Sequence, residues 1–308
     1  MGVPGYQEFM LPLVEIAADG NEHYVADALN TIADRFGLTE ADKEILLPSG
    51  AQTRLYNRVT WAVTYLSKSL LIEKTGRGRF RITERGKSVL ADKPNRIDNK
   101  YLERFDEYRI FKTKKGNKEI AEFDHIASNH AVDDSDVTPD ELIDSAYKEL
   151  RGTLADELLQ RVRSGSPKFF EHLVVDVLVA MGYGGSRFDA GQVVGKSGDG
   201  GIDGVIKEDR LGLDMVYIQA KRVESDIGPA AIREFVGSLG EQRAHKGVFI
   251  TSGGFTDGAK QAASKAHSRI VLIDGEQLAE FMIDHGVGVT DYKSYVVKKI
   301  DSDYFDSF

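Results

Sequence analysis

The 308-residue sequence contains no cysteine, so disulfide frameworks and cysteine-ligated zinc sites are excluded. It has no apolar run of membrane-spanning length, and its first residues lack the basic-then-apolar pattern of a signal peptide. We therefore expect a cytoplasmic protein that does not bind a membrane. With 41% hydrophobic residues the chain can bury ordinary cores, and its length predicts two domains joined by a linker.

An excess of positive charge is also lacking. The 40 Lys and Arg residues are outnumbered by 49 Asp and Glu, and the net charge of −9 argues against a simple basic nucleic-acid coat protein. The average conceals an asymmetry. Residues 1–53 hold two basic and nine acidic residues, whereas residues 54–93 hold ten basic and three acidic ones. A local basic stripe of this kind is the electrostatic footprint of a nucleic-acid-binding surface.

The opposite bias occurs in residues 123–144, which hold seven acidic residues and no Lys or Arg. Acidic stretches are usually solvated and have no further role. An acidic stretch in a DNA-binding protein could also repel DNA, or cover a basic surface while the protein is idle. We state this repelling or covering role as a hypothesis.

The basic region belongs to a segment with the pattern of a winged helix-turn-helix domain over residues 1–95. Apolar residues recur at helical spacing in three segments before the basic hairpin, and a capping-type pattern opens a short additional helix at residues 39–42. The expected elements are helices at 6–18, 23–36, 53–69 and 83–90, and hairpin strands at 70–74 and 79–83.

In winged helices the last helix before the hairpin enters the major groove, and the hairpin contacts phosphates or the minor groove. Polar and basic side chains decorate both elements. An alternative is a winged helix that binds a protein and whose arginines are merely solvated. The candidate DNA-binding residues are Arg54, Asn57 and Arg58 on the helix, and Arg77, Arg79 and Arg81 on the wing.

Residues 96–145 are interpreted as an acidic linker region, residues 146–290 as a second domain and residues 291–308 as a C-terminal tail. The second domain alternates helical and strand patterns, which predicts a mixed sheet between helices. Helices are expected at 146–162, 166–181, 228–239, from 256 and at 277–283. Strands are expected at 188–194, 202–206, 214–221, 246–252 and 270–273.

The chemistry of this domain centres on the glycine-rich segment from Gly195 and the strand that ends at Lys221. Side chains alternate along a strand, so Gln219 and Lys221 share one face. A hairpin would bring Asp203 beside them. A carboxylate, an amide oxygen and an ammonium at one point can hold Mg²⁺, orient a water and balance charge at a phosphate. The alternative is a glycine-rich loop with a buried polar residue and a lysine that extends to solvent.

Asp203, fifteen residues and then Gln-Ala-Lys resemble the Asp-(x)n-(Glu/Gln)-x-Lys core of the PD-(D/E)xK nucleases. The strings Gly-Asp-Gly-Gly-Ile-Asp-Gly-Val-Ile, Gln-Ala-Lys-Arg and Gly-Val-Phe-Ile-Thr-Ser-Gly-Gly-Phe-Thr resemble the Mrr-type methylation-dependent restriction endonucleases more closely. The spacing alone is a weak signal, whereas the glycine string and flanking strands make it strong. This resemblance implies a restriction-endonuclease-like α/β fold after an N-terminal α+β winged-helix domain.

The resemblance also implies site roles. Asp203 would be the main metal ligand, and Gln219 would add its amide oxygen. Glu171, on the helix at 166–181, matches a glutamate that the nuclease family carries beside the metal, and it would support the metal directly or through water. A surface glutamate is the ordinary alternative. Lys221 would orient or deprotonate the attacking water. The implied cofactor is Mg²⁺, with Mn²⁺ as an alternative.

The implied function is endonucleolytic cleavage of adenine- or cytosine-methylated foreign double-stranded DNA by a homodimer or higher assembly. Two alternatives stay open: a recombination or junction-resolving nuclease on the same fold, and a winged-helix regulator that has lost catalysis. The strand-to-helix turn at residues 251–256 is either an anion site or merely a tight turn.

Overall fold

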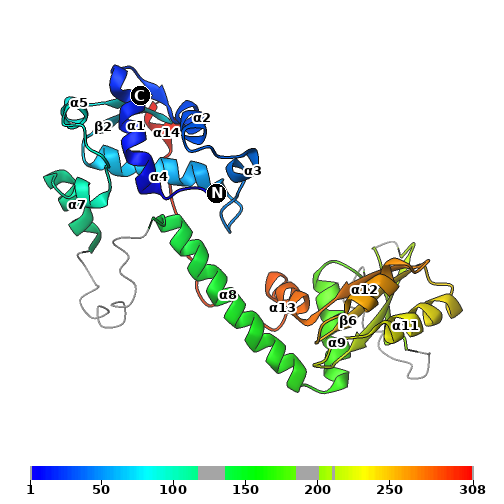
Figure 1. Cartoon of the computed structure of the whole chain (residues 1–308). Coiled ribbons are helices and arrows are strands. Elements are labelled where there is room, and N and C mark those ends of the chain that lie inside the picture. Colours follow the sequence, from blue (N-terminus) through cyan, green and yellow to red (C-terminus); the bar gives the residue numbers. More distant parts are fainter. Residues whose placement is uncertain (1, 117–135, 185–200, 210–211, 307–308) are drawn as a thin grey trace. The chain divides into compact units, whose positions relative to one another are not determined.

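A computed structural model describes residues 2–116, 136–184, 201–209 and 212–306, and divides the chain into two compact units (Figure 1). Residues 1–148 and 299–308 form the N-terminal unit, and residues 149–298 form the nuclease-like unit. The division falls within one continuous helix, α8 (Pro139–Ser164), which includes the helix expected at 146–162. Within the described ranges, no helix is long and apolar enough to cross a membrane.

The N-terminal unit combines short helices with a three-stranded antiparallel sheet in the order β1-β3-β2. Its hydrophobic core includes the fully buried Phe9, Leu66 and Phe80. The elements are η1 (Tyr6–Phe9), α1 (Met10–Ile16), η2 (Ala17–Asp19), β1 (His23–Tyr24), α2 (Val25–Arg35), α3 (Glu40–Lys43), α4 (Arg54–Lys68), β2 (Ile72–Gly76), β3 (Arg79–Ile82), α5 (Glu84–Ala91), α6 (Asn99–Leu102), α7 (Asp106–Gly116) and α14 (Ser302–Asp306).

Helix α4 is the predicted helix before the wing, and its expected apolar stripe is confirmed. The Thr53 hydroxyl accepts a hydrogen bond from the Tyr56 N–H and caps the helix. One face is buried in the core, and a substitution there would leave a cavity. The buried apolar residues of α4 are Leu55, Val59, Ala62, Val63 and Leu66.

The N-terminal unit differs from the expectation in three places. His23 and Tyr24 form strand β1 against β3, so the helix expected at 23–36 begins at Val25. Helices α6 and α7 pack into the core through the buried Leu102 and Tyr108, so the segment after residue 95 is not simply a linker. The last residues of the tail belong to this unit and include helix α14 (Figure 1).

The nuclease-like unit contains a four-stranded mixed sheet in the order β4-β5-β6-β7. Strands β4 and β5 are antiparallel, whereas β5, β6 and β7 are parallel. The predicted mixed α/β class is confirmed, while the strand expected at 188–194 lies outside the described residues. The elements after α8 are α9 (Pro167–Ala180), β4 (Gly204–Lys207), β5 (Met215–Lys221), α11 (Pro229–Glu241), β6 (Lys246–Thr251), α12 (Asp257–Ser264), β7 (Arg269–Ile273) and α13 (Gly275–Asp284).

Two separate cores cover the two faces of this sheet. Val216 and Ile218 of β5 pack with α9 and α13, as the strand alternation predicts. Tyr217 and Phe249 lie on the opposite face with α11 and α12. Figure 1 shows α9 and α11 on either side of the strands. Because side chains alternate, Gln219 and Lys221 leave β5 toward the α11 face.

Candidate active site and DNA-reading surface

Asp203 is held at the start of the β4–β5 hairpin by bonds to strand β5. Its own N–H donates to the Ile218 carbonyl at 2.8 Å. Its Oδ2 accepts the Gln219 Nε2 at 2.6 Å and the Ala220 N–H at 2.8 Å. The hairpin therefore brings Asp203 and Gln219 together, as the spacing in the sequence predicts.

The Asp203 carboxyl is half-buried, and this burial raises its pKa above the ordinary value, while the Ala220 N–H acts in the opposite direction. A raised pKa means that the carboxylate is poorly solvated and gains from a nearby positive charge. Such a perturbed carboxyl next to a polar cluster is a candidate functional group.

Gly201 permits the close approach of the Gln219 side chain. Its φ of +99° lies in the region that favours glycine, and a Cβ there would lie 3.1 Å from the Gln219 Oε1. The amide of Gln219 thus points its nitrogen at Asp203 and its oxygen toward the glycine backbone. A Cβ at residue 201 would crowd this oxygen.

Lys221 ends strand β5, and its side chain is exposed. In the part of the chain that the structure describes, its ammonium has no hydrogen-bond or ion-pair partner. Its backbone is held firmly, because the Thr251 hydroxyl donates to the Lys221 carbonyl at 2.9 Å. Thr251 is fully buried and lies opposite Lys221 in the parallel β5–β6 register.

The chain beyond Lys221 is held by further bonds from the end of β6. The fully buried Ser252 donates its hydroxyl to the Val223 carbonyl at 2.8 Å. Arg163 Nε donates to the Ser252 carbonyl at 3.0 Å, and Arg222 Nη1 donates to the Arg163 carbonyl at 2.5 Å. These hydroxyls continue the strand pairing after the regular ladder ends, so they fix where Lys221 leaves the sheet.

Glu171 lies in the second turn of α9, which packs on the sheet face opposite to Gln219 and Lys221. The described residues show no bond or ion pair between Glu171 and Asp203, Gln219 or Lys221. They also contain no cluster of three His, Cys, Asp or Glu side chains that could hold a metal ion. The role of Glu171 therefore stays a prediction.

The donor set at Asp203 nevertheless fits a hard divalent cation. Asp203 uses only Oδ2 in its bonds to β5, which leaves Oδ1 without a hydrogen bond within the described residues. Ala220 carries a backbone carbonyl at the same strand end, and Gln219 could add its amide oxygen if the amide turned, because its nitrogen now faces Asp203. Carboxylate, amide and carbonyl oxygens are the ligands that Mg²⁺ and similar cations take. A single carboxylate, however, makes this a sparsely charged site.

The turn after β6 packs closely against the preceding segment. A Cβ on Gly253 would lie 2.5 Å from the Ser225 carbonyl oxygen, and one on Gly254 would lie 2.3 Å from the Asp226 Oδ1. These close approaches fit the tight-turn interpretation of residues 251–256, and the anion-site interpretation stays a prediction.

The three wing arginines are each paired with a carboxylate of the same unit. Arg77 approaches Asp303 of α14 at 3.6 Å, and Arg79 contacts Glu22 at 3.0 Å. Arg81 contacts Glu73 on the adjacent strand at 2.6 Å. The side chains of these pairs are partly to largely exposed, so the pairs are weak and exchangeable.

The candidate residues on α4 are covered by the first turn of α8. Asn57 is fully buried, and its Nδ2 donates to Asp140 at 2.7 Å. Arg58 contacts both Glu141 oxygens, with its Nη2 at 2.9 Å from Oε1, and Arg54 approaches the same carboxylate at 3.5 Å. In this structure the first turn of α8 keeps Asn57 and Arg58 from contacting a DNA groove. The sequence does not indicate that these residues are covered.

With this geometry in place, comparisons with known proteins become informative. The model of the Mrr N-terminal domain matches residues 6–92, and a restriction endonuclease family model matches residues 162–282. The chain is 37% identical over 308 residues to the type IV methyl-directed restriction enzyme EcoKMrr of Escherichia coli (strain K12), covering 99% of this chain and all of that one. The chain belongs to the Mrr family of restriction endonucleases.

Membership in this family makes the chain a DNA-hydrolysing enzyme. A solved structure of the MspJI restriction endonuclease with a 27-mer oligonucleotide is 26% identical, with a TM-score of 0.35. That match covers 42% of this chain and 31% of the other. In this Mrr-family chain Asp203, Gln219 and Lys221 lie within the span of the restriction endonuclease model, and all six candidate DNA-binding residues lie within that of the N-terminal domain.

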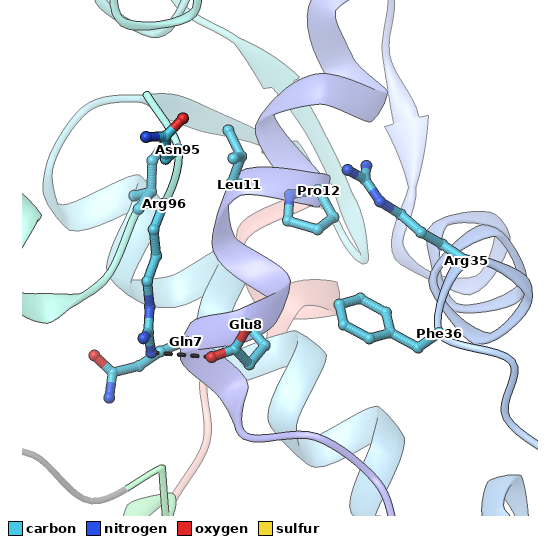
Figure 2. A pocket seen from close by; sticks show the side chains of 9 residues that line it. Gln7, Glu8, Leu11, Pro12, Arg35, Phe36, Asn95 and Arg96 are labelled. Carbon is cyan, nitrogen blue, oxygen red and sulfur yellow. Dashed lines mark ion pairs between the residues drawn. The ribbon is translucent and has the colours of Figure 1, made fainter. Parts of the chain in front are cut away.

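The N-terminal unit of this Mrr-family enzyme also has a pocket of about 290 Å³, shown in Figure 2. Arg96 lies on one side, where a dashed line joins it to Glu8, and Phe36 and Arg35 lie across Pro12. Both arginines already have carboxylate partners, because Arg96 contacts Glu8 at 3.0 Å and Arg35 pairs with Glu15. We therefore assign no ligand to this pocket.

Sequence reasoning missed Thr251 and Ser252 as residues of the Mrr-family site. Both end an apolar strand and could be taken for the start of a turn. Their position in the sheet could have identified them. In the parallel pair of strands, a hydroxyl residue at the end of β6 lies beside the proposed catalytic lysine at the end of β5. That inference requires the strand register, which the sequence alone does not provide.

Proposed function

We propose that this enzyme cleaves adenine- or cytosine-methylated foreign DNA in a Mg²⁺-dependent reaction. The observation that carries the proposal is the contact of Asp203 with Gln219 and the Ala220 N–H at the strand end that Lys221 completes. The methylated substrate is supported by the name of the EcoKMrr relative, which is methyl-directed. No methyltransferase motif occurs in the chain, so protection of host DNA would depend on a mark that the host lacks.

Each residue of the site has a distinct role in this proposal. Asp203 Oδ1, the Gln219 amide oxygen and the Ala220 carbonyl would hold a divalent cation, which supplies Lewis-acid stabilisation of charge on the scissile phosphate. Lys221 orients the attacking water and, as an ammonium, stabilises the negative charge that develops at phosphorus, while the proton of the water leaves to solvent. Thr251 holds the Lys221 backbone, so the ammonium approaches from a constant direction.

In this proposal the N-terminal unit recognises the methyl group on the DNA. Apolar contact with one methyl group in the major groove is worth only about 1–2 kcal/mol, or roughly tenfold to thirtyfold in affinity. Because this is too little to protect host DNA, two marks read by two protomers are needed. Cleavage of both strands also requires two active sites, and this chain has one. We therefore include a homodimer on DNA in the proposal.

The decisive experiment compares cleavage of one plasmid prepared without methylation, with adenine methylation and with cytosine methylation. Mg²⁺ should support cutting of a methylated form only, and Lys221→Met should remove cutting while leaving DNA binding intact. Efficient cutting of the fully unmethylated plasmid by the wild-type enzyme would contradict the proposed substrate. Sedimentation of the Lys221→Met protein with methylated duplex tests the dimer, and a stable monomer that nicks one strand would exclude it.

A further inference from the structure

The polar face of α4 contacts a specific set of groups at the start of α8. Thr138 and Glu141 form a capping box, in which the Thr138 N–H donates to Glu141 at 2.9 Å and the Glu141 N–H donates to the Thr138 hydroxyl at 3.3 Å. The box fixes the orientation of this turn. Both residues are buried. The turn that carries Thr138, Asp140 and Glu141, here called the acidic turn, therefore packs on α4 as a defined structure.

Asn57 makes two complementary hydrogen bonds to this turn. Its Nδ2 donates to Asp140 Oδ2 at 2.7 Å, and its Oδ1 accepts the Thr138 hydroxyl at 2.5 Å. An asparagine that reads adenine in the major groove makes the same pair of bonds, because adenine offers an N7 acceptor beside an N6 donor. The acidic turn thus presents to Asn57 the pattern of a base edge.

Arg58 is engaged in the same manner. Its Nε lies 3.1 and 3.2 Å from the two oxygens of Glu141, and its Nη2 lies 2.9 Å from Oε1, so two donors of the guanidinium meet one carboxylate as they meet guanine or phosphate. Its Nη1 donates to the carbonyls of Val3 and Pro4 at 2.6 and 2.9 Å. Trp61 Nε1 also donates to Asp140 Oδ2, at 3.1 Å.

From this match of donors and acceptors we infer that the polar face of α4 is a docking surface for which the acidic turn and the DNA major groove compete. The inference rests on the proposed role of α4 in reading DNA. With the acidic turn docked, the enzyme is in a resting state in which its recognition helix is covered. Apparent DNA affinity is then reduced to the fraction of molecules in which the turn has left α4.

Competition between the acidic turn and DNA would also link DNA binding to cleavage. The acidic turn begins α8, and α8 continues past the division between the units into the nuclease-like unit. DNA that displaces the turn from α4 therefore changes the attachment of the helix that leads to the catalytic unit. Binding of a good site and release of α8 from the N-terminal unit become one event.

The test uses two matched variants in the full chain. Asp140→Ala with Glu141→Ala removes the docked carboxylates, and Glu149→Ala with Asp156→Ala removes two exposed acidic residues farther along the same helix. Both change the net charge equally. DNA affinity is measured without divalent metal over a series of salt concentrations, and thermal unfolding confirms that each protein is folded.

The first variant should bind duplex DNA about tenfold or more tightly than the control variant. Its salt dependence should steepen by roughly one to two units, because Arg54 and Arg58 become available to phosphates. Adding Arg58→Ala should remove most of this gain. Equal affinity and equal salt slope in the two variants would overturn the inference and assign the α8 contact a structural role.

A second measurement covers the case in which the first variant does not fold. The Ser49 N–H donates to Asp144 on α8 at 3.2 Å, and the chain has no native cysteine. In the Ser49→Cys, Asp144→Cys protein, oxidation should hold the acidic turn on α4 and weaken DNA binding about tenfold, and reduction should restore it. Equal binding by the cross-linked and reduced forms would overturn the inference.

The same assay separates this inference from the proposed function. Arg79→Gln with Arg81→Gln should weaken binding to all sequences and lower the salt slope by roughly one unit per lost phosphate contact. If this wing variant loses binding while the Asp140→Ala, Glu141→Ala variant binds like its control, the N-terminal unit binds DNA but the acidic turn does not compete for α4. No effect of either change would remove the reading role itself.

Discussion

The candidate DNA-binding residues of the N-terminal unit and the candidate catalytic lysine of the nuclease-like unit differ in whether a carboxylate contacts them. All six candidate DNA-binding residues of the N-terminal unit contact carboxylates of their own unit, through Asp140, Glu141, Asp303, Glu22 and Glu73. In the nuclease-like unit, Lys221 is exposed and has no such partner among the described residues. Within the described residues the candidate reading groups are thus engaged with carboxylates, whereas the candidate catalytic cation is not.

The proposed roles of these groups would account for the difference. A groove or wing arginine exchanges one anionic partner for another when DNA binds, and an exposed pair costs little to break. A catalytic lysine must meet the phosphate and water directly, and a carboxylate bound to it would neutralise its charge and occupy its position. The Lys221 backbone is accordingly held by Thr251, at some distance from the ammonium.

The largest expected effect comes from removing the candidate catalytic cation. Lys221→Ala should lower the single-turnover cleavage rate by about 10³-fold or more while leaving DNA affinity nearly unchanged, because the ammonium acts on the transition state. Arg79→Gln with Arg81→Gln should show the reverse pattern, with weaker binding and a nearly normal rate at saturating DNA. Loss of binding in Lys221→Ala would place the lysine in the DNA-binding surface and end the contrast.

A smaller loss is expected from the residue that holds this lysine. Thr251→Val keeps the shape of the buried side chain but removes the bond to the Lys221 carbonyl, so the rate should fall by about tenfold to a hundredfold. The Michaelis constant should stay constant. Thr251→Ser should recover most of the rate. If serine fails to rescue a folded protein, the threonine contributes packing and not positioning.

The third prediction adds charge to the catalytic site. In Gln219→Glu, a second carboxylate would replace an amide whose nitrogen lies 2.6 Å from Asp203 Oδ2. Repulsion should lower the melting temperature of the metal-free protein, and Mg²⁺ should bind about tenfold more tightly and restore stability. Calorimetric titration and thermal unfolding measure both. Weaker metal binding than in the wild-type protein would show that residue 219 is not a ligand.

The contact between Asp203 and Gln219 could be predicted from the sequence because it depends on local geometry. Alternation along β5 places Gln219 and Lys221 on one face, and the hairpin returns Asp203 beside Gln219. The apolar stripe of α4 was equally accessible, because helical periodicity alone selects Leu55 and Leu66 for the core. Each of these inferences uses residues that are close in the chain.

The contacts that could not be predicted join distant segments. Asn57 has the composition of a surface recognition residue, and its burial depends on Thr138 and Asp140, which lie 81 and 83 residues away. Strand β1 is only two residues long, so its pairing with β3 leaves no periodic pattern to distinguish it from the following helix. Such features are decided by tertiary packing, which overrides local preference.

The smallest expected effect separates pairs that hold the N-terminal unit together from pairs that DNA would displace. Arg85 of α5 contacts Glu107 of α7 through two hydrogen bonds of 2.7 and 2.9 Å, and this contact lowers the pKa of Glu107 from 4.5 to about 2. A carboxyl whose pKa is lower in the folded protein stabilises it above the ordinary pKa and loses this effect as pH falls from 4.5 to about 2. Glu107→Gln should therefore melt slightly below the wild-type protein near neutral pH, and the difference should vanish at about pH 2. The same substitution should leave DNA affinity unchanged, because this pair attaches α7 and contacts none of the candidate reading residues. A stability difference that persists at about pH 2 would show that Glu107 acts through packing and not through its charge.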